Sequence, residues 1–342
     1  MRTLLYTQEF PPFKGGVANY YGQMLSHWPE GEEIFVLTQN RHGRFRQYFI
    51  HFCQLVRAVY KHKIDYIIVG QVLPLGSVVH FFWRFRRLKY AVFLHGMDLA
   101  FALKHPRKAW LAKLILQDAN RIICANSYTA EMLKVKFPHL ASTIVVVNPG
   151  VSHYQEREKL PQLRKDQEEI ILLSIGRLVK RKGFAETIKA LPSGVRYVII
   201  GQGPEAAALH QIADSRVTFI ESVSEAAKWS WLEACDIFIM PSVDLDGDFE
   251  GFGIVYLEAN LAGKPVIAGN SGGIKDAVID GYNGLVVNGH SLPAIREAIL
   301  KLASDPDLRH KLGQQGKARA EKDFSWSKQA QLIYTAITNQ DK

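Results

Sequence analysis

Cysteine is scarce in this sequence of 342 residues, and no two cysteines form a CxxC pair. The three that occur, Cys53, Cys124 and Cys235, are an odd number at wide spacings. This pattern fits neither a disulfide framework nor a cysteine-rich zinc site. We expect three buried, small, apolar side chains in a protein of the reducing cytosol.

Long uninterrupted hydrophobic runs are also lacking. The apolar stretch from Leu4 to Tyr6 is too short for the core of a signal peptide. The segment from Tyr66 to Trp83 contains no Asp, Glu, Lys or Arg, but Gly70 and Pro74 interrupt it. We therefore predict a strand over Tyr66 to Val69, then a loop and a helix, in place of a transmembrane helix.

The composition contains no bias toward disorder or repeats. Hydrophobic residues make up 47% of the chain and charged residues 22%, with 26 Gly and 14 Pro. These proportions are those of a folded globular protein and exclude an intrinsically disordered chain. Because a domain has roughly 150 residues, this length predicts two domains, each with its own core.

Acidic residues are under-represented in the first half of the chain only. Residues 1–150 hold 19 Lys and Arg against 8 Asp and Glu, a net charge of +11. Residues 151–342 hold 23 against 25, a net charge of −2, which together give the formal +9. This asymmetry favours a polyanionic partner, either nucleic acid or an anionic membrane surface.

Basic and aromatic residues interleave most densely from Phe81 to Tyr90. Such a mixture at the end of a helix suits the headgroup region of a membrane. The predicted membrane contacts are Phe81, Trp83, Arg84, Arg86, Arg87 and Lys89. A second cluster of this character consists of Arg41, Arg44, Phe45, Arg46 and Tyr48. The alternative, aromatic residues in the core beside a solvated basic face, stays open.

Short apolar runs alternate with helix-length stretches along most of the chain. The runs are Thr3 to Tyr6, Ile34 to Leu37, Tyr66 to Val69, Tyr90 to Leu94, Arg121 to Ala125, Ile144 to Val147, Ile170 to Ile175, Tyr197 to Ile200, Val217 to Ile220, Ile237 to Met240, Pro265 to Ala268 and Leu285 to Val287. This alternation predicts parallel sheets covered by helices on both faces. The polar stretch from Ser152 to Glu169 divides the series in two.

We therefore predict an α/β fold of two doubly wound, Rossmann-like domains. The first covers residues 1–155, a linker covers 156–169, and the second domain covers 170–322. In such sheets, ligands bind beyond the carboxyl ends of the strands. Two domains that face each other would place the site in the cleft between their loop edges.

Glycine and basic residues follow the first expected strand of each domain. Gly15 and Gly16 precede a helix, where backbone amides can receive a phosphate or a sugar, although a plain turn would look the same. In the second domain, Arg177 and Lys182 share one loop with Gly176, and this pair suits a diphosphate.

Two familiar nucleotide motifs are incomplete. No GxxxxGK[ST] run occurs, and the GQG that includes Gly203 lacks the third glycine of a dinucleotide fingerprint, because Ala206 stands there. A nicotinamide-dependent enzyme is therefore disfavoured.

The stretch from Pro241 to Val278 holds two spaced glutamates, Glu250 in a glycine-rich loop and Glu258 in the helix that follows. Carboxylates accept hydrogen bonds from vicinal hydroxyls, so a hexose and a ribose are natural partners. The nearby acids Asp244, Asp246 and Asp248 lack the spacing of an EF-hand, and the bare DxD motif that remains possible is unspecific, so they are taken as loop acids.

Together these motifs resemble a family-4 retaining glycosyltransferase of the GT-B fold. The segments that carry the resemblance are PPFKGG, HGMD at residues 95–98, NPGV, GRLVKRKG, GQGP, EGFGIVYLE with its Glu pair, and GKPVIAGNSGGIKD. They run along nearly the whole chain. Two positions depart from the family pattern: Glu221 stands where many relatives carry glycine, and Asp276 where glutamate is usual.

The resemblance implies a nucleotide-diphosphate sugar bound mainly by the second domain and an acceptor bound by the first. Arg177 and Lys182 would neutralise the departing diphosphate, and Glu250 would hold sugar hydroxyls. His95 would contact the sugar near its reacting face, and Glu258 would hold the ribose. The implied donor-binding residues are Gly15, Gly16, Gly176, Gly203, Glu258, Gly272 and Gly273.

The family transfers sugars with retention, typically without a metal, so no cofactor is expected beyond the nucleotide sugar as co-substrate. The resemblance also implies that residues 323–342 form a helix that crosses back to the first domain. We expect a cytoplasmic enzyme, peripheral on an anionic membrane, that acts on a lipid-linked or cell-envelope glycan. The alternatives are a nucleotide-sugar epimerase or phosphorylase of related shape, and a basic nucleic-acid-binding protein, for which no known binding motif is present.

Overall fold

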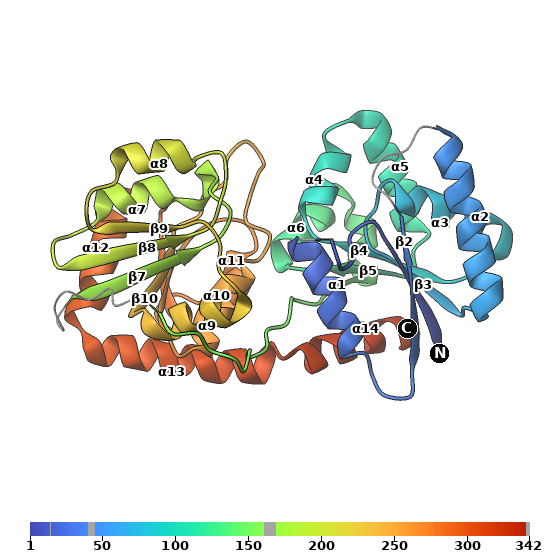
Figure 1. The fold of residues 1–342 in the computed structure, drawn as a ribbon. Helices are drawn as coiled ribbons and strands as arrows, with labels where there is room; N and C mark the ends of the chain where they lie inside the picture. Colours follow the sequence, from blue (N-terminus) through green and yellow to red (C-terminus); the bar gives the residue numbers. More distant parts are fainter. Residues whose placement is uncertain (14, 40–44, 161–168, 340–342) are drawn as a thin grey trace. The chain divides into compact units, whose positions relative to one another are not determined.

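The computed structural model describes residues 1–13, 15–39, 45–160 and 169–339. They form two compact units: unit 1 contains Met1–Gly150 and Trp326–Lys342, and unit 2 contains Val151–Ser325 (Figure 1). The chain therefore passes from one unit to the other twice, after Gly150 and after Ser325. Most of the linker predicted over 156–169 lies outside the described residues, since these omit 161–168.

Unit 1 contains a six-stranded parallel sheet in the order β2-β1-β3-β4-β5-β6. Its strands are β1 (Arg2–Thr7), β2 (Glu33–Thr38), β3 (Tyr66–Val69), β4 (Tyr90–Leu94), β5 (Arg121–Cys124) and β6 (Ile144–Val146). Its helices are α1 (Gly16–Ser26), α2 (Phe45–His62), α3 (Leu75–Arg86), α4 (Met97–Leu103), α5 (Pro106–Gln117), α6 (Ser127–Lys136) and α14 (Trp326–Thr338), with the short η1 (Pro138–Thr143). The order in which the strands are added switches sides at β1, so the loops after β1 and β3 frame a ligand-binding position.

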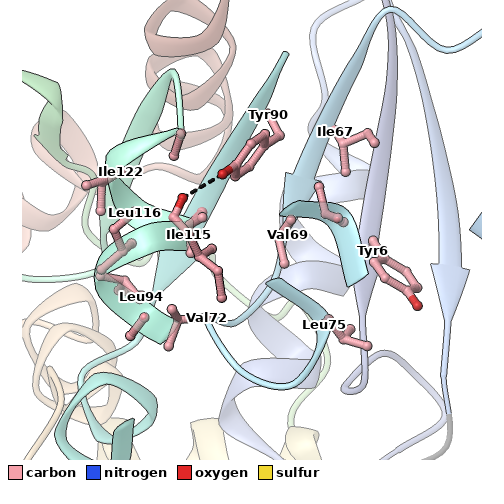
Figure 2. Close-up of a cluster of buried hydrophobic side chains, with 14 of the residues drawn as sticks. Tyr6, Ile67, Val69, Val72, Leu75, Tyr90, Leu94, Ile115, Leu116 and Ile122 are labelled. Atoms are coloured by element: carbon pink, nitrogen blue, oxygen red, sulfur yellow. Dashed lines mark hydrogen bonds between the residues drawn. The ribbon is translucent and has the colours of Figure 1, made fainter. Parts of the chain in front are cut away.

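Side chains of the sheet in unit 1 alternate between two cores. Leu4 and Tyr6 face one core with residues of α2, α3 and α5, whereas Leu5 faces the other with α1 and α14. Figure 2 shows part of the first core, where the buried Tyr90 hydroxyl donates a hydrogen bond of 2.6 Å to the carbonyl of Ile115. Burial on both faces explains why these strands are continuous apolar runs.

Unit 2 repeats the plan with the strand order β12-β11-β10-β7-β8-β9, again all parallel. Its strands are β7 (Ile170–Ile175), β8 (Val195–Ile200), β9 (Val217–Ile220), β10 (Ile237–Met240), β11 (Val266–Gly269) and β12 (Gly284–Val287). Its helices are η2 (Lys180–Lys182), α7 (Phe184–Ala190), α8 (Ala206–Ile212), α9 (Glu225–Ala234), α10 (Ile254–Leu261), α11 (Ile274–Ala277), α12 (Leu292–Ser304) and α13 (Pro306–Asp323). The two sheets confirm the predicted pair of doubly wound domains.

In the sheet of unit 2, the order in which the parallel strands are added switches sides between β7 and β10. The loop after β7 contains the GRLVKRKG segment, and the loop after β10 contains Glu250. Because carboxyl ends of parallel strands share one sheet edge, the two loops lie side by side at the reversal. This topology brings the basic loop and the acidic loop together.

The segment from Tyr66 to Trp83 is a strand, a loop and a helix, as predicted. Within the described part of the chain, no helix combines the length and the apolar character needed to span a bilayer. The expectation of three buried cysteines is wrong for Cys53, which is exposed on α2, while Cys124 and Cys235 are buried. On α2 the buried positions are Leu55 and Val59, one turn apart, and Cys53 points away from that stripe.

The last helix, α14, belongs to unit 1, where it packs with α1. Its side chains Trp326, Ile333 and Ile337 are buried in the core that contains Leu5. The preceding residues are tied to unit 2, because the amide of Val151 donates to the carbonyl of Phe324 at 2.7 Å. This is the segment predicted to cross back to the first domain.

Candidate functional site

A cluster of charged side chains lies where β7 and β10 end in unit 2. Lys182 is buried at the end of η2, and its Nζ lies 2.5 Å from Oε2 of Glu250. Arg181 donates from Nη1 to the same oxygen at 2.8 Å, and its Nε lies 3.0 Å from Oδ1 of Asp248. Glu250 is only 8% exposed. The structure therefore joins Lys182 to Glu250, which the sequence placed in separate loops.

The electrostatics of Glu250 follow from this arrangement. Burial alone would raise the pKa of the Glu250 carboxyl, but the Lys182 and Arg181 cations outweigh burial and hold the pKa below its usual value. The carboxylate is therefore charged near neutral pH. Two cations share one of its oxygens, so a negatively charged ligand that binds here would compete with Glu250 for Lys182 and Arg181.

The loop that carries Glu250 is held in place through its backbone. The Glu250 amide donates to Oγ of Ser271 at 3.1 Å, and that hydroxyl donates to Asp244. The Gly273 amide donates to the Glu250 carbonyl at 2.9 Å. Gly272 has a φ of +51°, and a Cβ there would lie 2.2 Å from the Glu250 carbonyl oxygen. Gly272 and Gly273 thus support Glu250 directly, a contact that the sequence did not predict.

Three other predicted site residues, Gly176, Arg177 and Gly203, lie in the loops after β7 and β8. A Cβ on Gly203 would lie 2.3 Å from the Leu178 carbonyl oxygen. The glycine at this position therefore lets the loops after β7 and β8 approach each other closely. Gly176 lies near Lys182, whose Nζ is 4.0 Å from the position of a Cβ. Arg177 is exposed, and it forms no ion pair with any described residue. It lies on the same loop but outside the Lys182–Glu250 cluster.

Glu258 lies on α10, and its Oε1 is 2.9 Å from Nζ of Lys228 on α9. The same Nζ lies 2.7 Å from Glu225. Burial would lower the pKa of Lys228, but Glu258 and Glu225 outweigh it, and the pKa lies above its usual value. Lys228 is therefore a cation that holds one carboxylate oxygen of Glu258.

Sequence reasoning missed Arg181 and Lys228. Arg181 stands next to Lys182 in a run of basic residues, so adjacency was an available signal. Lys228 follows Glu225 by three positions at the start of a helix, but nothing in the sequence connects it with Glu258, 30 residues away.

In unit 1, His95 follows β4 and sits among aromatic rings. It stacks on Phe93 with ring centres 4.8 Å apart, and its Nε2 lies 2.8 Å from the Tyr21 hydroxyl. Burial lowers the pKa of His95 to about 3, so the ring is neutral near pH 7. The backbone amides of His95 and Gly96 both donate to Oδ1 of Asp98 at 3.0 Å. The HGMD segment is thus a compact loop that fixes one imidazole.

Asp98 also borders a pocket of about 510 Å³ in unit 1. Leu73, Phe101 and Leu111 line it with apolar surface, and Lys108 adds a charge. Oδ2 of Asp98 is buried and has no hydrogen-bond partner among the residues that the structure describes. Burial raises the pKa of Asp98 to about 6, against the lowering effect of backbone hydrogen bonds. The pocket therefore combines apolar walls with a carboxyl group and a lysine.

Gly15 and Gly16 lie at the start of α1, both exposed. A Cβ on Gly16 would meet no atom within 4 Å, whereas one on Gly15 would touch the Phe13 ring at 3.4 Å. Packing inside the chain therefore does not require a glycine at position 16. Open space at a helix start is compatible with the predicted approach of a ligand.

The predicted membrane residues lie at the end of α3 and just beyond it. Phe81, Arg84, Arg86, Arg87 and Lys89 are exposed, and Phe85 beside them is 69% exposed. Trp83 is half-buried against the core, and Arg87 stacks over its ring at 4.2 Å.

Other helices of unit 1 also carry exposed aromatic side chains. They are Tyr48, Phe49 and Tyr60 on α2, Phe101 on α4 and Trp110 on α5. Of the second basic cluster, Arg41 and Arg44 lie outside the described residues, and nothing is described of the side chains of Phe45 and Arg46. Large apolar side chains beside basic ones are typical of an interaction surface.

Within the described ranges, no group of three or more His, Cys, Asp or Glu residues is arranged to hold a metal ion. Two of the three loop acids have other partners. Asp244 receives the Ser271 hydroxyl, and Asp248 pairs with Arg181.

Comparisons with known proteins match both halves of the chain. Residues 14–154 match the family described as Glycosyltransferase Family 4, and residues 155–319 match the family described as Glycosyl transferases group 1. The chain is 28% identical to the GDP-mannose-dependent monoacylated alpha-(1-6)-phosphatidylinositol monomannoside mannosyltransferase of Corynebacterium glutamicum, covering 95% of this chain and 94% of the relative. It is 26% identical to the GDP-mannose-dependent alpha-(1-6)-phosphatidylinositol monomannoside mannosyltransferase of Mycobacterium tuberculosis, covering 99% of both.

Among solved structures, the Anabaena protein HepE in complex with UDP has a TM-score of 0.78 to this chain at 18% identity. The match covers 99% of this chain and 100% of HepE. At this identity the likeness concerns the fold, and it extends over both units.

Proposed function

The chain belongs to the nucleotide-sugar glycosyltransferases of the GT-B fold, with a family 4 half followed by a group 1 half, and from this premise we propose its reaction. It transfers a hexosyl group, with retention of the anomeric configuration, from a nucleotide-diphosphate sugar to a hydroxyl of a lipid-linked or cell-envelope glycan. The bond between the anomeric carbon and the phosphate oxygen breaks. The acceptor oxygen bonds to the same carbon, and its proton passes to the departing phosphate.

The observation that supports this proposal most strongly is the pair of cations on Glu250. The reaction leaves negative charge on the diphosphate, so fixed positive charge at that point lowers the barrier. Lys182 and Arg181 already lie within 2.5 and 2.8 Å of one carboxylate oxygen, in a buried position where electrostatic interactions are strong. Arg177, exposed on the same loop, supplies a further donor for the diphosphate. The proposal includes no metal, because Lys182, Arg181 and Arg177 neutralise the negative charge of the departing diphosphate.

Glu250 and Glu258 accept hydrogen bonds from the hydroxyl groups of the donor. When the diphosphate binds Lys182 and Arg181, the Glu250 carboxylate is released from part of its ion pair and accepts hydrogen bonds from the sugar. Glu258 keeps Oε1 on Lys228 and offers its second oxygen to the ribose. Gly15 and Gly16, exposed at the start of α1, leave space for a phosphate or a sugar.

The acceptor binds unit 1 in this proposal. The two mannosyltransferases that resemble the chain carry lipid acceptors in their names, phosphatidylinositol monomannosides. The pocket beside Asp98 provides apolar walls together with a carboxyl and Lys108, which suits an acceptor that combines an apolar part with hydroxyl or phosphate groups. The exposed aromatic and basic surface of α3 provides contact with the membrane that holds such an acceptor.

Product analysis tests the reaction. The purified protein is incubated with GDP-mannose or UDP-glucose, with and without a membrane lipid extract as acceptor. We expect sugar to move to a lipid product with an α-linkage, only when the extract is present. Conversion of the nucleotide sugar into a second nucleotide sugar without acceptor would indicate an epimerase. Release of sugar 1-phosphate by inorganic phosphate would indicate a phosphorylase, and either result would overturn the proposal.

A further inference from the structure

Two adjacent tyrosines of α1 pack on His95 in nearly the same way. The ring centres of Tyr20 and Tyr21 lie 5.4 and 5.3 Å from the centre of the imidazole, both edge-on. Only the Tyr21 hydroxyl reaches the ring nitrogen, at 2.8 Å from Nε2. The Tyr20 hydroxyl is buried and has no hydrogen-bond partner among the described residues.

The hydrogen bonds of the Tyr21 hydroxyl determine which tautomer His95 adopts. The Tyr21 hydroxyl donates its single hydrogen to the carbonyl oxygen of Gly70 at 2.8 Å, and a carbonyl oxygen can only accept. The Tyr21 oxygen must therefore accept from His95, so Nε2 carries the ring hydrogen. A neutral imidazole has one N–H, which leaves Nδ1 as a hydrogen-bond acceptor. No partner of Nδ1 lies within the described ranges.

The surroundings hold this arrangement rigidly. A Cβ on Gly70 would lie 2.7 Å from Oγ1 of Thr7 and 3.0 Å from the Tyr21 hydroxyl, so only glycine fits there. Asp98 fixes the backbone of the histidine loop, and Phe93 supports one face of the ring. Burial holds the pKa of His95 to about 3, so the ring stays neutral over the physiological range.

We propose that Tyr21 is a positioning residue that fixes His95 as the Nε2–H tautomer, so that Nδ1 accepts a hydrogen bond from a substrate hydroxyl. This inference rests on the proposed transfer reaction, because it assumes that His95 meets a sugar. The hydroxyl belongs either to the transferred sugar or to the acceptor, and both present the same donor. His95 then orients a substrate without acting as a cation or as a proton donor.

Nuclear magnetic resonance of protein labelled with ¹⁵N-histidine tests the tautomer without any assay of activity. We expect the wild-type protein to give the shifts of a neutral Nε2–H ring for His95, assigned by the loss of that signal in His95→Ala. Tyr21→Phe should convert this signal to a mixture of tautomers. Tyr20→Phe, the matched control, should leave it unchanged. A wild-type ring protonated on Nδ1, or an unchanged signal in Tyr21→Phe, would overturn the proposal.

Steady-state kinetics then test whether the tautomer of His95 affects the rate of transfer. Tyr21→Phe should lower kcat about tenfold, the value of one hydrogen bond, while Tyr20→Phe stays within about twofold. In a His95→Ala background the loss caused by Tyr21→Phe should shrink to less than about twofold. Equal losses in both backgrounds would mean that Tyr21 only supports the fold, and would overturn the proposal.

Hydrolysis of the donor by water, measured beside transfer to the acceptor, distinguishes the two sources of the hydroxyl. A loss in donor hydrolysis as well as in transfer places the hydroxyl on the donor sugar, and a loss in transfer alone places it on the acceptor. A wild-type protein that shows the expected tautomer but no transfer would contradict the proposed function while leaving the assignment of Tyr21 intact.

Discussion

Lys182 and Glu250 are 68 residues apart in the sequence and 2.5 Å apart in the structure. Their residue types were predicted for the site, because a cation suits a diphosphate and a carboxylate suits a sugar. The contact itself was not predictable, since it depends on the order in which β7 and β10 pair. Lys228 and Tyr21 were missed for the same reason, as their partners Glu258 and His95 are distant in sequence.

Lys182→Ala should lower kcat by about 10²- to 10³-fold, because it removes positive charge at the position where the leaving group becomes negative. Arg181 still pairs with Glu250 in this variant, so the protein should remain folded, although with a lower melting temperature. Lys180→Ala is the matched control, since Lys180 is an exposed basic residue two positions away. Steady-state rates and melting curves of both variants check this, and a near-normal rate in Lys182→Ala would contradict the assigned role.

The depressed pKa of Glu250 gives a pH dependence with a definite sign. A carboxyl whose pKa is lower in the folded state stabilises the fold above its unfolded value, near 4.5, and this stabilisation is lost as the pH falls through the lower, folded value. Glu250→Gln removes this pH-dependent stabilisation, because glutamine does not ionise.

Urea unfolding of the wild type and Glu250→Gln from pH 7 to pH 3 measures this effect. The wild type should be the more stable protein at pH 7, and the difference between their free energies of unfolding should shrink below about pH 4.5. A difference that stays constant across this range would show that the Lys182 and Arg181 ion pairs contribute no stability.

At the scale of elements, the sequence predicted the strands more closely than the loops. The runs at Ile170 to Ile175 and at Val217 to Ile220 coincide with β7 and β9. Continuous apolar residues define a strand buried on both faces, so composition alone reveals it. Loops depend on backbone geometry, and the support that Gly272 and Gly273 give to Glu250 became visible only in the structure.

Gly272→Ala should therefore damage the site as well as the fold. The residue adopts a positive φ, and a Cβ would collide with the Glu250 carbonyl oxygen at 2.2 Å. We expect a loss of roughly 1–3 kcal/mol in the free energy of unfolding and at least about tenfold in kcat.

Gly194→Ala provides the matched control for backbone strain. Gly194 has a φ of +73°, but a Cβ there meets no atom within 4 Å. This variant should lose about 1 kcal/mol of stability and keep its activity. Denaturant unfolding and steady-state assays compare the two, and equal effects on kcat would contradict the supporting role of Gly272.

At the scale of the whole molecule, the basic half of the chain carries the exposed aromatic side chains of α2 to α5. The charge asymmetry was evident in the sequence, but the exposure of Phe81 and Phe85 and the partial burial of Trp83 were not. Helical periodicity alone does not say which aromatic residue of a cluster faces the core. The membrane contact therefore stays a prediction that concerns the end of α3 and the residues just beyond it.

Flotation with liposomes tests this contact. Wild-type protein should float with vesicles that contain anionic lipids at low salt, and less as the salt concentration rises. The double variant Phe85→Ser and Arg86→Ser should bind at least about tenfold more weakly. Val135→Ser is the control, because Val135 is 83% exposed on α6, outside this surface. Absence of flotation at low salt would remove the membrane contact and leave the enzymatic proposal in place.

The central claim is that the diphosphate of the donor binds the cationic loop after β7. A crystal structure of the protein with bound GDP or UDP tests it most directly. We predict phosphate oxygens within hydrogen-bond distance of Lys182, with the ribose near Glu258. A diphosphate bound away from both the Lys182 loop and the two glutamates would contradict the account.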